Sequence, residues 1–179
     1  MIGSVQLAAA LLLAGAGMAK LVAPDPAAAM LRKAWWTRLR SGASLALIRV
    51  GGVIEVGVGA AVLATGGRVA ATLLGCCYLA FLIVAARLLR RGQRTSCGCF
   101  GATDSPVGIG HLVVNLVAVG VAITAVVRPP GPVGGLFDHH ALTGVVGLGQ
   151  AVLLAYLAFL SITALPALVA ARRQLLEAA

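Results

Sequence analysis

Five long apolar runs, separated by short polar segments, dominate the hydrophobic pattern of this chain. The runs are apolar on all sides and lack the one-sided stripe of a helix on the surface of a soluble protein. Each is long enough to cross about 30 Å of hydrocarbon, which takes roughly 17 to 25 helical residues. The predicted spans are Ile2–Ala23, Ser44–Thr65, Val69–Ala86, His111–Val127 and Ala141–Val169. The pattern therefore predicts an all-α, polytopic membrane bundle.

The segments between the runs divide the chain. Lys20 near the end of the first run and two prolines just after it stand where a signal peptide would have a small-residue cleavage site, so we interpret this run as a mature helix. Gly66 and Gly67 predict a tight turn, whereas the Pro- and Gly-rich segment 129–132 ends any helix. We therefore expect a four-helix membrane domain over residues 1–127, followed by a fifth helix and a short basic tail over residues 128–179.

The segment between Pro24 and Ser41 has a different composition from the runs. Trp35 and Trp36 stand among several basic residues, as in a helix that lies at the membrane surface with aromatic and cationic anchors. An ordinary basic loop is the alternative interpretation.

Composition supports a lipid environment. Hydrophobic residues make up 60% of the chain and charged residues 11%, and no soluble fold of this size could cover so much apolar surface. The net charge of +9 would suggest nucleic acid only if the basic residues formed one stripe, but they lie in the polar gaps. We expect a lipid bilayer around the chain and no nucleic acid. The preference for Arg over Lys, with abundant Ala and Gly, points to a bacterial source.

The basic residues also indicate an orientation. The connections after the first and third spans, together with the C-terminal tail, hold Arg32, Lys33, Arg38, Arg40, Arg87, Arg90, Arg91, Arg94, Arg172 and Arg173. The opposite connections hold Arg68 and Arg128. Because cytoplasmic loops collect Lys and Arg, we expect the N-terminus outside the bacterial inner membrane and the C-terminus in the cytoplasm. The connection that carries Cys97 and Cys99 is then cytoplasmic too.

Cys97 and Cys99 are the main candidates for chemistry. They flank Gly98, whose backbone freedom would allow a small, strained disulfide that is easily reduced and therefore suited to exchange. Arginines just before them, Arg90 among them, would stabilise the thiolate form. Two thiolates could instead hold a soft metal, although the sequence completes no four-ligand spacing. A glycine turn with incidental cysteines is the third interpretation.

A second pair of cysteines, Cys76 and Cys77, lies within the third span. Buried free cysteines commonly act as small apolar packing residues, and this is the simpler interpretation here. A second redox pair is the alternative.

Charged residues inside the spans give the second candidate site. Glu55 lies near the middle of its span, where a lone charge is costly, so it needs a partner. Lys20 and Arg49 are within reach of long side chains, and a buried ion pair is expected, whether for function or only for structural specificity. Chain order brings these residues, His111 and Asn115 into the half of the bundle that also carries Cys97 and Cys99.

Several of these residues resemble a known family. The segment Gly17-Met18-Ala19-Lys20-Leu21, Arg49 and Glu55 with Gly59, and above all Cys97-Gly98-Cys99-Phe100-Gly101 are similar to the MauE (methylamine-utilisation) family. This family belongs to the wider DoxX-like group of four-helix membrane proteins. The resemblance covers about residues 10–127, so the fifth span lies beyond it. Asn115 resembles an Asn that follows an Arg in that family, but Val114 stands before it here.

The resemblance implies help in maturing a disulfide-rich exported enzyme, such as the methylamine dehydrogenase small subunit, alongside a thioredoxin-like partner. Cys97 and Cys99 would exchange electrons, and we assign no cofactor and no metal. This role favours thiols outside the cell, in conflict with the charge distribution. Either electrons arrive from a cytoplasmic donor, or the loop dips inward, or binding partners override the charge rule. A soft-metal (Cu or Zn) handling protein and a non-catalytic membrane assembly factor are the alternative functions.

Overall fold

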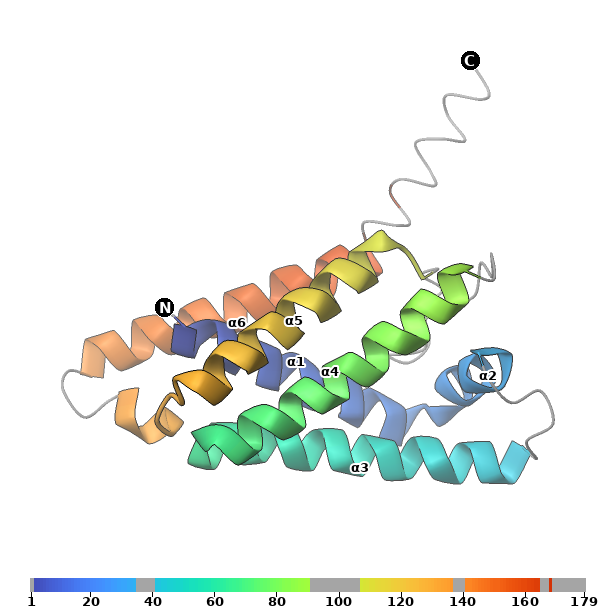
Figure 1. Ribbon diagram of the computed structural model, residues 1–179, viewed down its shortest axis with the longest axis horizontal. Coiled ribbons are helices and arrows are strands. Elements are labelled where there is room, and N and C mark those ends of the chain that lie inside the picture. Colours follow the sequence, from blue (N-terminus) through green and yellow to red (C-terminus); the bar gives the residue numbers. More distant parts are fainter. Residues whose placement is uncertain (1, 35–40, 91–106, 137–140, 165–167, 169–179) are drawn as a thin grey trace, which may run out of the picture.

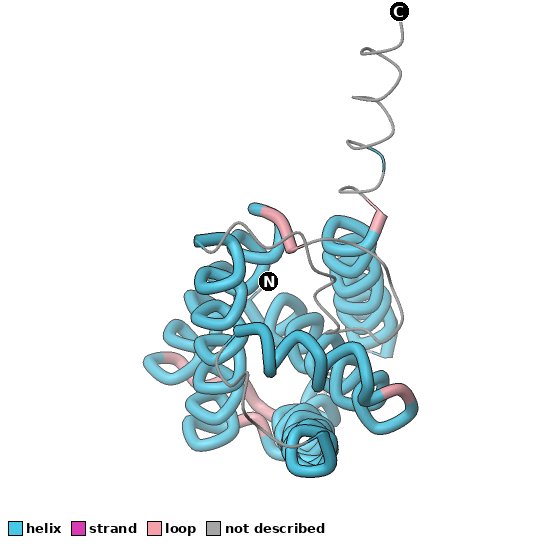
Figure 2. The backbone as a smooth tube through the Cα atoms, turned by 90° about the vertical axis from the view of Figure 1, so that its right-hand side faces the viewer, coloured by secondary structure: helices cyan, strands magenta, loops and turns pink. Residues whose placement is uncertain are grey.

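The computed structural model describes residues 2–34, 41–90, 107–136, 141–164 and 168. Within these ranges the regular elements are all helical, and Figures 1 and 2 show no strand among them. The elements are α1 (Ile2–Val22), α2 (Pro24–Ala34), α3 (Ser41–Thr65), α4 (Gly67–Arg90), α5 (Ile109–Val127), the 3-10 turn η1 (Val133–Leu136) and α6 (Ala141–Thr163).

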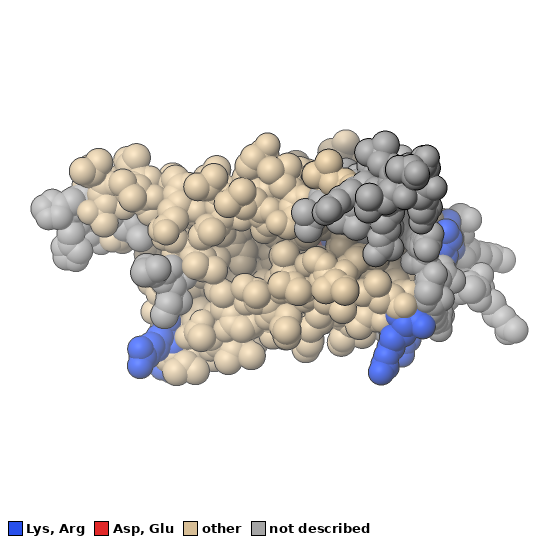
Figure 3. All heavy atoms as spheres, turned by 90° about the horizontal axis from the view of Figure 1, so that it is seen from above, with Lys and Arg blue, Asp and Glu red and all other residues tan. Residues whose placement is uncertain are grey.

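Five helices, α1, α3, α4, α5 and α6, are long and apolar enough to cross a membrane. Large apolar side chains such as Val53, Ile54 and Leu153 are exposed on their outer faces, as expected where lipid replaces water. On the face shown in Figure 3, Lys and Arg lie at the two ends of the molecule and uncharged surface fills the length between them. The prediction of a polytopic helical bundle is therefore confirmed.

The helix boundaries differ from the predicted spans at several ends: α3 begins at Ser41, α5 begins at Ile109, and α6 ends at Thr163, before the predicted end at Val169. Helix α4 runs from Gly67 to Arg90, beyond the predicted apolar run at both ends, because polar and basic residues continue the helix past the hydrocarbon. Segment Pro24–Ala34 is helical, in favour of the helix interpretation, whereas Trp35 and Trp36 lie outside the described residues.

Helix α1 is the centre of the bundle. It packs along α3 on one side and α6 on another, and it also contacts α5, while α4 packs along α5. The main core cluster includes Leu13 of α1, Val62 of α3, Leu74 of α4 and Ala122 of α5. Helices α1, α3, α4 and α5 therefore share one core, and α6 packs on the α1 side of this core (Figure 1).

The bundle has two distinct ends. At one, which we call the thiol end, α4 stops at Arg90 and α5 begins at Ile109, and the connection between them carries Cys97 and Cys99 in the sequence. At the other, the proline end, the α3–α4 turn meets the segment after α5, where the Gly67 N–H donates to the Pro130 carbonyl at 3.3 Å. Gly66 and Gly67 have φ of 61° and 73°, which glycine adopts without strain.

Candidate functional site

The site begins with the close approach of α1 and α3. A Cβ atom at Gly17 would lie 2.7 Å from the Gly52 carbonyl oxygen and 2.9 Å from the Glu55 Cβ. A Cβ at Gly52 would in turn lie 2.9 Å from the Gly17 carbonyl oxygen. Only glycine fits at both positions, and small residues of this kind allow membrane helices to pack closely. The contact brings the middle of α3 against the last turns of α1.

A buried ion pair lies beside this contact. Lys20 Nζ is 2.5 Å from Glu55 Oε1 and 2.6 Å from Oε2, and both side chains are buried. The ammonium also lies 4.3 Å from the centroid of the Phe81 ring, in cation–π geometry. Lys20 therefore directs its charge at one carboxylate and one aromatic face, which lowers the cost of holding it in the membrane.

The ion pair opens onto a cavity of about 160 Å³ at the thiol end of the bundle. Lys20, Glu55, Asn115 and Phe81 line it together with apolar side chains of α2, α3 and α4. Helix α2 covers this cavity through Met30, and the Arg32 Nη1 donates to Ser44 Oγ at 2.8 Å, which fastens α2 to α3. The polar site is thus enclosed between the helices.

Arg49 does not join this pair. Its side chain is exposed, and it stands six residues before Glu55 on α3, a separation that turns a helical side chain to another face. Snorkelling toward the membrane surface, the simpler interpretation of Arg49, agrees with this position.

His111 and Asn115 stand in the first turns of α5, directly after the connection that carries the thiols. The Gly108 N–H donates to His111 Nδ1 at 3.2 Å, and the Asn115 Nδ2 donates to the His111 carbonyl at 2.7 Å. Both side chains are buried. His111 and Asn115 line a second, smaller hollow of about 20 Å³, and Phe81 and Asn115 form the wall that it shares with the ion-pair cavity.

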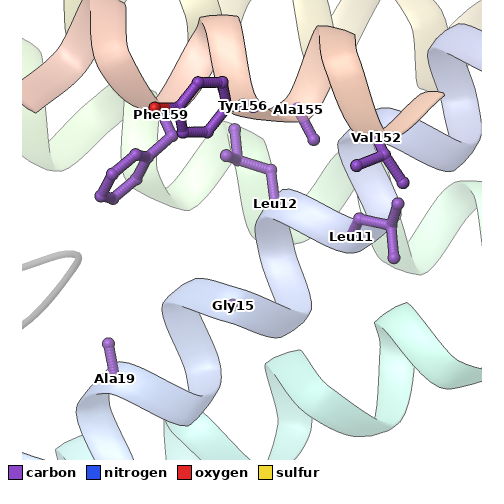
Figure 4. Close-up of a pocket in the computed structure, with 8 residues that line it drawn as sticks. All are labelled: Leu11, Leu12, Gly15, Ala19, Val152, Ala155, Tyr156 and Phe159. Carbon is purple, nitrogen blue, oxygen red and sulfur yellow. The ribbon is translucent and has the colours of Figure 1, made fainter. Parts of the chain in front are cut away.

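Apolar cavities lie on the other side of α1. A groove of about 510 Å³ runs between α1 and α6, with Leu11, Leu12, Tyr156 and Phe159 along its sides (Figure 4). A cavity of about 210 Å³ lies between α1, α5 and α6. Leu12 lines the groove, this cavity and the small hollow beside His111, so the three spaces are neighbours.

The cysteines are divided between described and undescribed parts of the chain. Cys97 and Cys99 lie outside the described residues. Cys76 is exposed and Cys77 is half-buried, and both are free thiols. Cys77 packs against the main core cluster and lies within electrostatic range of Glu55 and Lys20. Its position fits the packing interpretation, and the second-pair interpretation stays a prediction.

Some polar residues escaped the sequence reasoning. Gln6 is buried, and neither of its amide atoms has a hydrogen-bond partner in the part of the chain that the structure describes. Tyr78 is also buried, with its hydroxyl donating to the Ala9 carbonyl at 2.7 Å. Both lie in otherwise apolar runs, where only the isolated polar residue itself gives a signal. Over the described ranges, no group of three His, Cys, Asp or Glu side chains could hold a metal ion.

Comparison with known proteins gives one match. A family model described as methylamine utilisation protein MauE matches residues 1–128, which include α1 to α5 and the connection with the thiols. No curated protein and no solved structure matches the chain. The matched segment contains the ion-pair cavity and ends before α6 begins.

Proposed function

Because this chain belongs to the methylamine utilisation protein MauE family, we propose that it is a membrane thiol–disulfide electron-transfer or maturation factor in which Cys97 and Cys99 cycle between dithiol and disulfide. Membership of the family implies a membrane protein of methylamine utilisation. The proposal adds thiol–disulfide chemistry at Cys97 and Cys99 to this family assignment.

One observation carries this proposal. The cysteine pair occurs in the connection between α4 and α5, and four of the buried polar residues of the described bundle lie in the half toward the same end. Lys20, Glu55, His111 and Asn115 are costly to keep inside a membrane, and such residues usually mark a functional site. A redox pair in the connection at this end, with a polar interior next to it, is a suitable arrangement for exchange.

The exchange proceeds in two steps. The thiolate of one cysteine attacks a disulfide of the partner and forms a mixed disulfide, and the second cysteine then releases the partner as a dithiol. Two electrons and two protons leave Cys97 and Cys99 for the partner, and the reverse sequence reduces the pair again. The exposed guanidinium groups of Arg87 and Arg90 at the end of α4 favour the thiolate, which is the nucleophile.

The family resemblance supports the choice of proposed partners. A thioredoxin-like protein is the proposed exchange partner, and an exported enzyme such as the methylamine dehydrogenase small subunit is the proposed client. The charge distribution favours a bacterial inner-membrane protein with the thiol end in the cytoplasm, while an exported client would meet the thiols outside. Labelling with a membrane-impermeant maleimide in intact cells and in inverted vesicles separates the two arrangements. Cys97 reacts in the cells if it faces outward and in the vesicles if it faces inward.

A second experiment tests the redox cycle. In a Cys76→Ser, Cys77→Ser background, a mass-tagged maleimide should add no tag to the oxidised protein in membranes and two tags after reduction. The Cys97→Ser, Cys99→Ser variant should lose client maturation, whereas the background variant should keep it. Thiols that stay fully reduced in the membrane with every electron acceptor supplied, or a double variant that still matures the client, would contradict the proposal.

A further inference from the structure

The imidazole of His111 has one ring nitrogen without a partner. Its Nδ1 accepts a hydrogen bond from the Gly108 N–H at 3.2 Å, so Nδ1 carries no proton and the proton of the neutral ring is on Nε2. His111 is 2% exposed, and within the described ranges nothing accepts from Nε2. A buried donor without an acceptor is costly, so this N–H indicates a missing acceptor atom.

The hollow beside His111 has room for one such atom. Its volume of about 20 Å³ is slightly more than the 10–15 Å³ that one oxygen of water size occupies. Around it, Tyr78 and Asn115 already donate to the backbone carbonyls of Ala9 and His111. Among the residues that line the hollow in the described chain, His111 Nε2 is the one buried side-chain nitrogen or oxygen that lacks a partner. A water needs two to four polar partners, whereas a carbonyl oxygen needs only this one donor.

A ring-sized apolar cavity adjoins the hollow. The cavity of about 210 Å³ between α1, α5 and α6 shares Leu12, Tyr78 and Val114 with the hollow. It exceeds the roughly 150 Å³ of an apolar cavity that accepts benzene. Val113 and Val117, on its rim, are 52% and 55% exposed on the lipid-facing side of α5. A ring could therefore enter from the bilayer and leave an apolar tail among the lipids.

From this geometry we infer that the two adjoining spaces bind the head group of a lipid-soluble quinone. The ring lies in the apolar cavity, and one carbonyl oxygen occupies the hollow and accepts the hydrogen bond from His111 Nε2–H. The ester carbonyl of a phospholipid has the same acceptor chemistry but no ring to fill the cavity, so the two ligands are separable by experiment.

The inference deepens the proposed function, on which its redox role rests. The dithiol of Cys97 and Cys99 would be oxidised to the disulfide, and the quinone would take up the two electrons and two protons to become a quinol. The pair would thereby return to the disulfide form after each exchange in which it has taken two electrons and two protons from a partner dithiol. The binding site itself depends only on α1, α4, α5 and α6.

Equilibrium binding of a short-tailed benzoquinone to the full-length protein in nanodiscs tests the site. His111→Leu removes the donor and should weaken binding at least tenfold, whereas His111→Gln keeps an N–H near the Nε2 position and should stay within about threefold of wild type. Leu154→Trp fills the apolar cavity and should also weaken binding tenfold or more. Its matched control is Leu153→Trp, on the exposed side of α6, which should bind as wild type does.

A photoreactive azidoquinone gives the location independently. It should label residues of α5 and α6 that line the cavity, and excess phospholipid should not displace it. Labelling that phospholipid abolishes, or binding that is equal in wild type, His111→Leu and Leu154→Trp, would overturn the inference. The Cys97→Ser, Cys99→Ser variant should still bind quinone. If it binds but the wild-type thiols never cycle, the proposed function fails and the site stands. If the thiols cycle equally well in quinone-free membranes, the proposed function stands and the redox role of the quinone fails.

Discussion

Helix α1 meets two neighbours in very different ways. Toward α3 its backbone comes so close that glycine is required on both helices, and a charged pair is sealed beside the contact. Toward α6 it presents Leu11, Leu12 and Gly15 across a groove of about 510 Å³, with no charged side chain along it (Figure 4). The α1–α3 contact specifies one arrangement of the two helices, whereas the α1–α6 contact leaves space between them.

The difference shows how a membrane protein can separate specificity from access. Lipid tails are as apolar as leucine, so helices gain little from apolar burial alone, and close packing and polar pairs decide which helices associate. The α1–α3 contact uses both of these. The α1–α6 contact uses neither to the same extent, and its spaces can take up molecules from the bilayer. The MauE match covers α3 and stops before α6.

The largest effect is expected from breaking the ion pair. Glu55→Leu leaves the buried Lys20 ammonium without its carboxylate, and removing one partner of a buried pair typically costs about 3–5 kcal/mol. The free energy of unfolding, measured by SDS titration with circular dichroism in mixed micelles, should fall by an amount in this range. A substitution at the α1–α6 groove should have no such cost, because no charged side chain lines it.

The matched control is the double variant Lys20→Met, Glu55→Leu, which removes both charges and keeps similar volume. It should recover most of the stability that Glu55→Leu loses, because no unpaired charge remains. If the double variant is as unstable as the single one, shape and not charge holds α1 against α3.

The next effect concerns the backbone contact. Gly17→Ala inserts a methyl group 2.7 Å from the Gly52 oxygen, so α1 and α3 must move apart, with a cost of roughly 1–3 kcal/mol. Gly15→Ala, on the same helix, meets nothing within 4 Å and should change stability by less than about 0.5 kcal/mol. Equal effects of the two substitutions in the same SDS titration would show that the two faces of α1 are packed alike.

The smallest effect is expected at the α6 contact. Ala155 lines both the groove and the apolar cavity, so Ala155→Leu should fit into existing space and change the free energy of unfolding by less than about 1 kcal/mol. Ala10 of α1 is fully buried in the main core, and Ala10→Leu should cost more than about 1 kcal/mol. A large loss at Ala155 would mean that α6 packs as tightly as α3 does.

Much of the fold could be predicted from the sequence, because span length and apolar composition depend on the bilayer and not on tertiary detail. The need of Glu55 for a partner was also predictable, since a carboxylate in the middle of a span has few alternatives. The choice of Lys20 over Arg49 was not settled by depth, as both are within reach along the membrane normal. It depends on the face that each residue presents, and on the glycine contact that brings α1 against α3.

The unpartnered ring nitrogen of His111 and the hollow beside it could not be predicted from the sequence. The orphan Nε2 depends on the hydrogen bond from Gly108, and the hollow beside it includes Ile162 of α6, far along the chain. Neither the tautomer of a histidine nor a cavity among apolar side chains leaves a pattern in sequence spacing. In the same way, Phe81 is an unremarkable member of an apolar run until its ring lies over the Lys20 ammonium.

The pairing of Lys20 with Glu55 also bears on how the chain is made. Lys20 lies two residues from the end of α1, so while α1 alone has left the ribosome its ammonium can remain among lipid phosphates. The Glu55 carboxylate cannot reach the membrane surface in this way, because it lies more than three helical turns from the start of α3. The arrival of α3 therefore draws Lys20 inward, and this neutralisation is an early step of assembly that α6, synthesised last, has no part in.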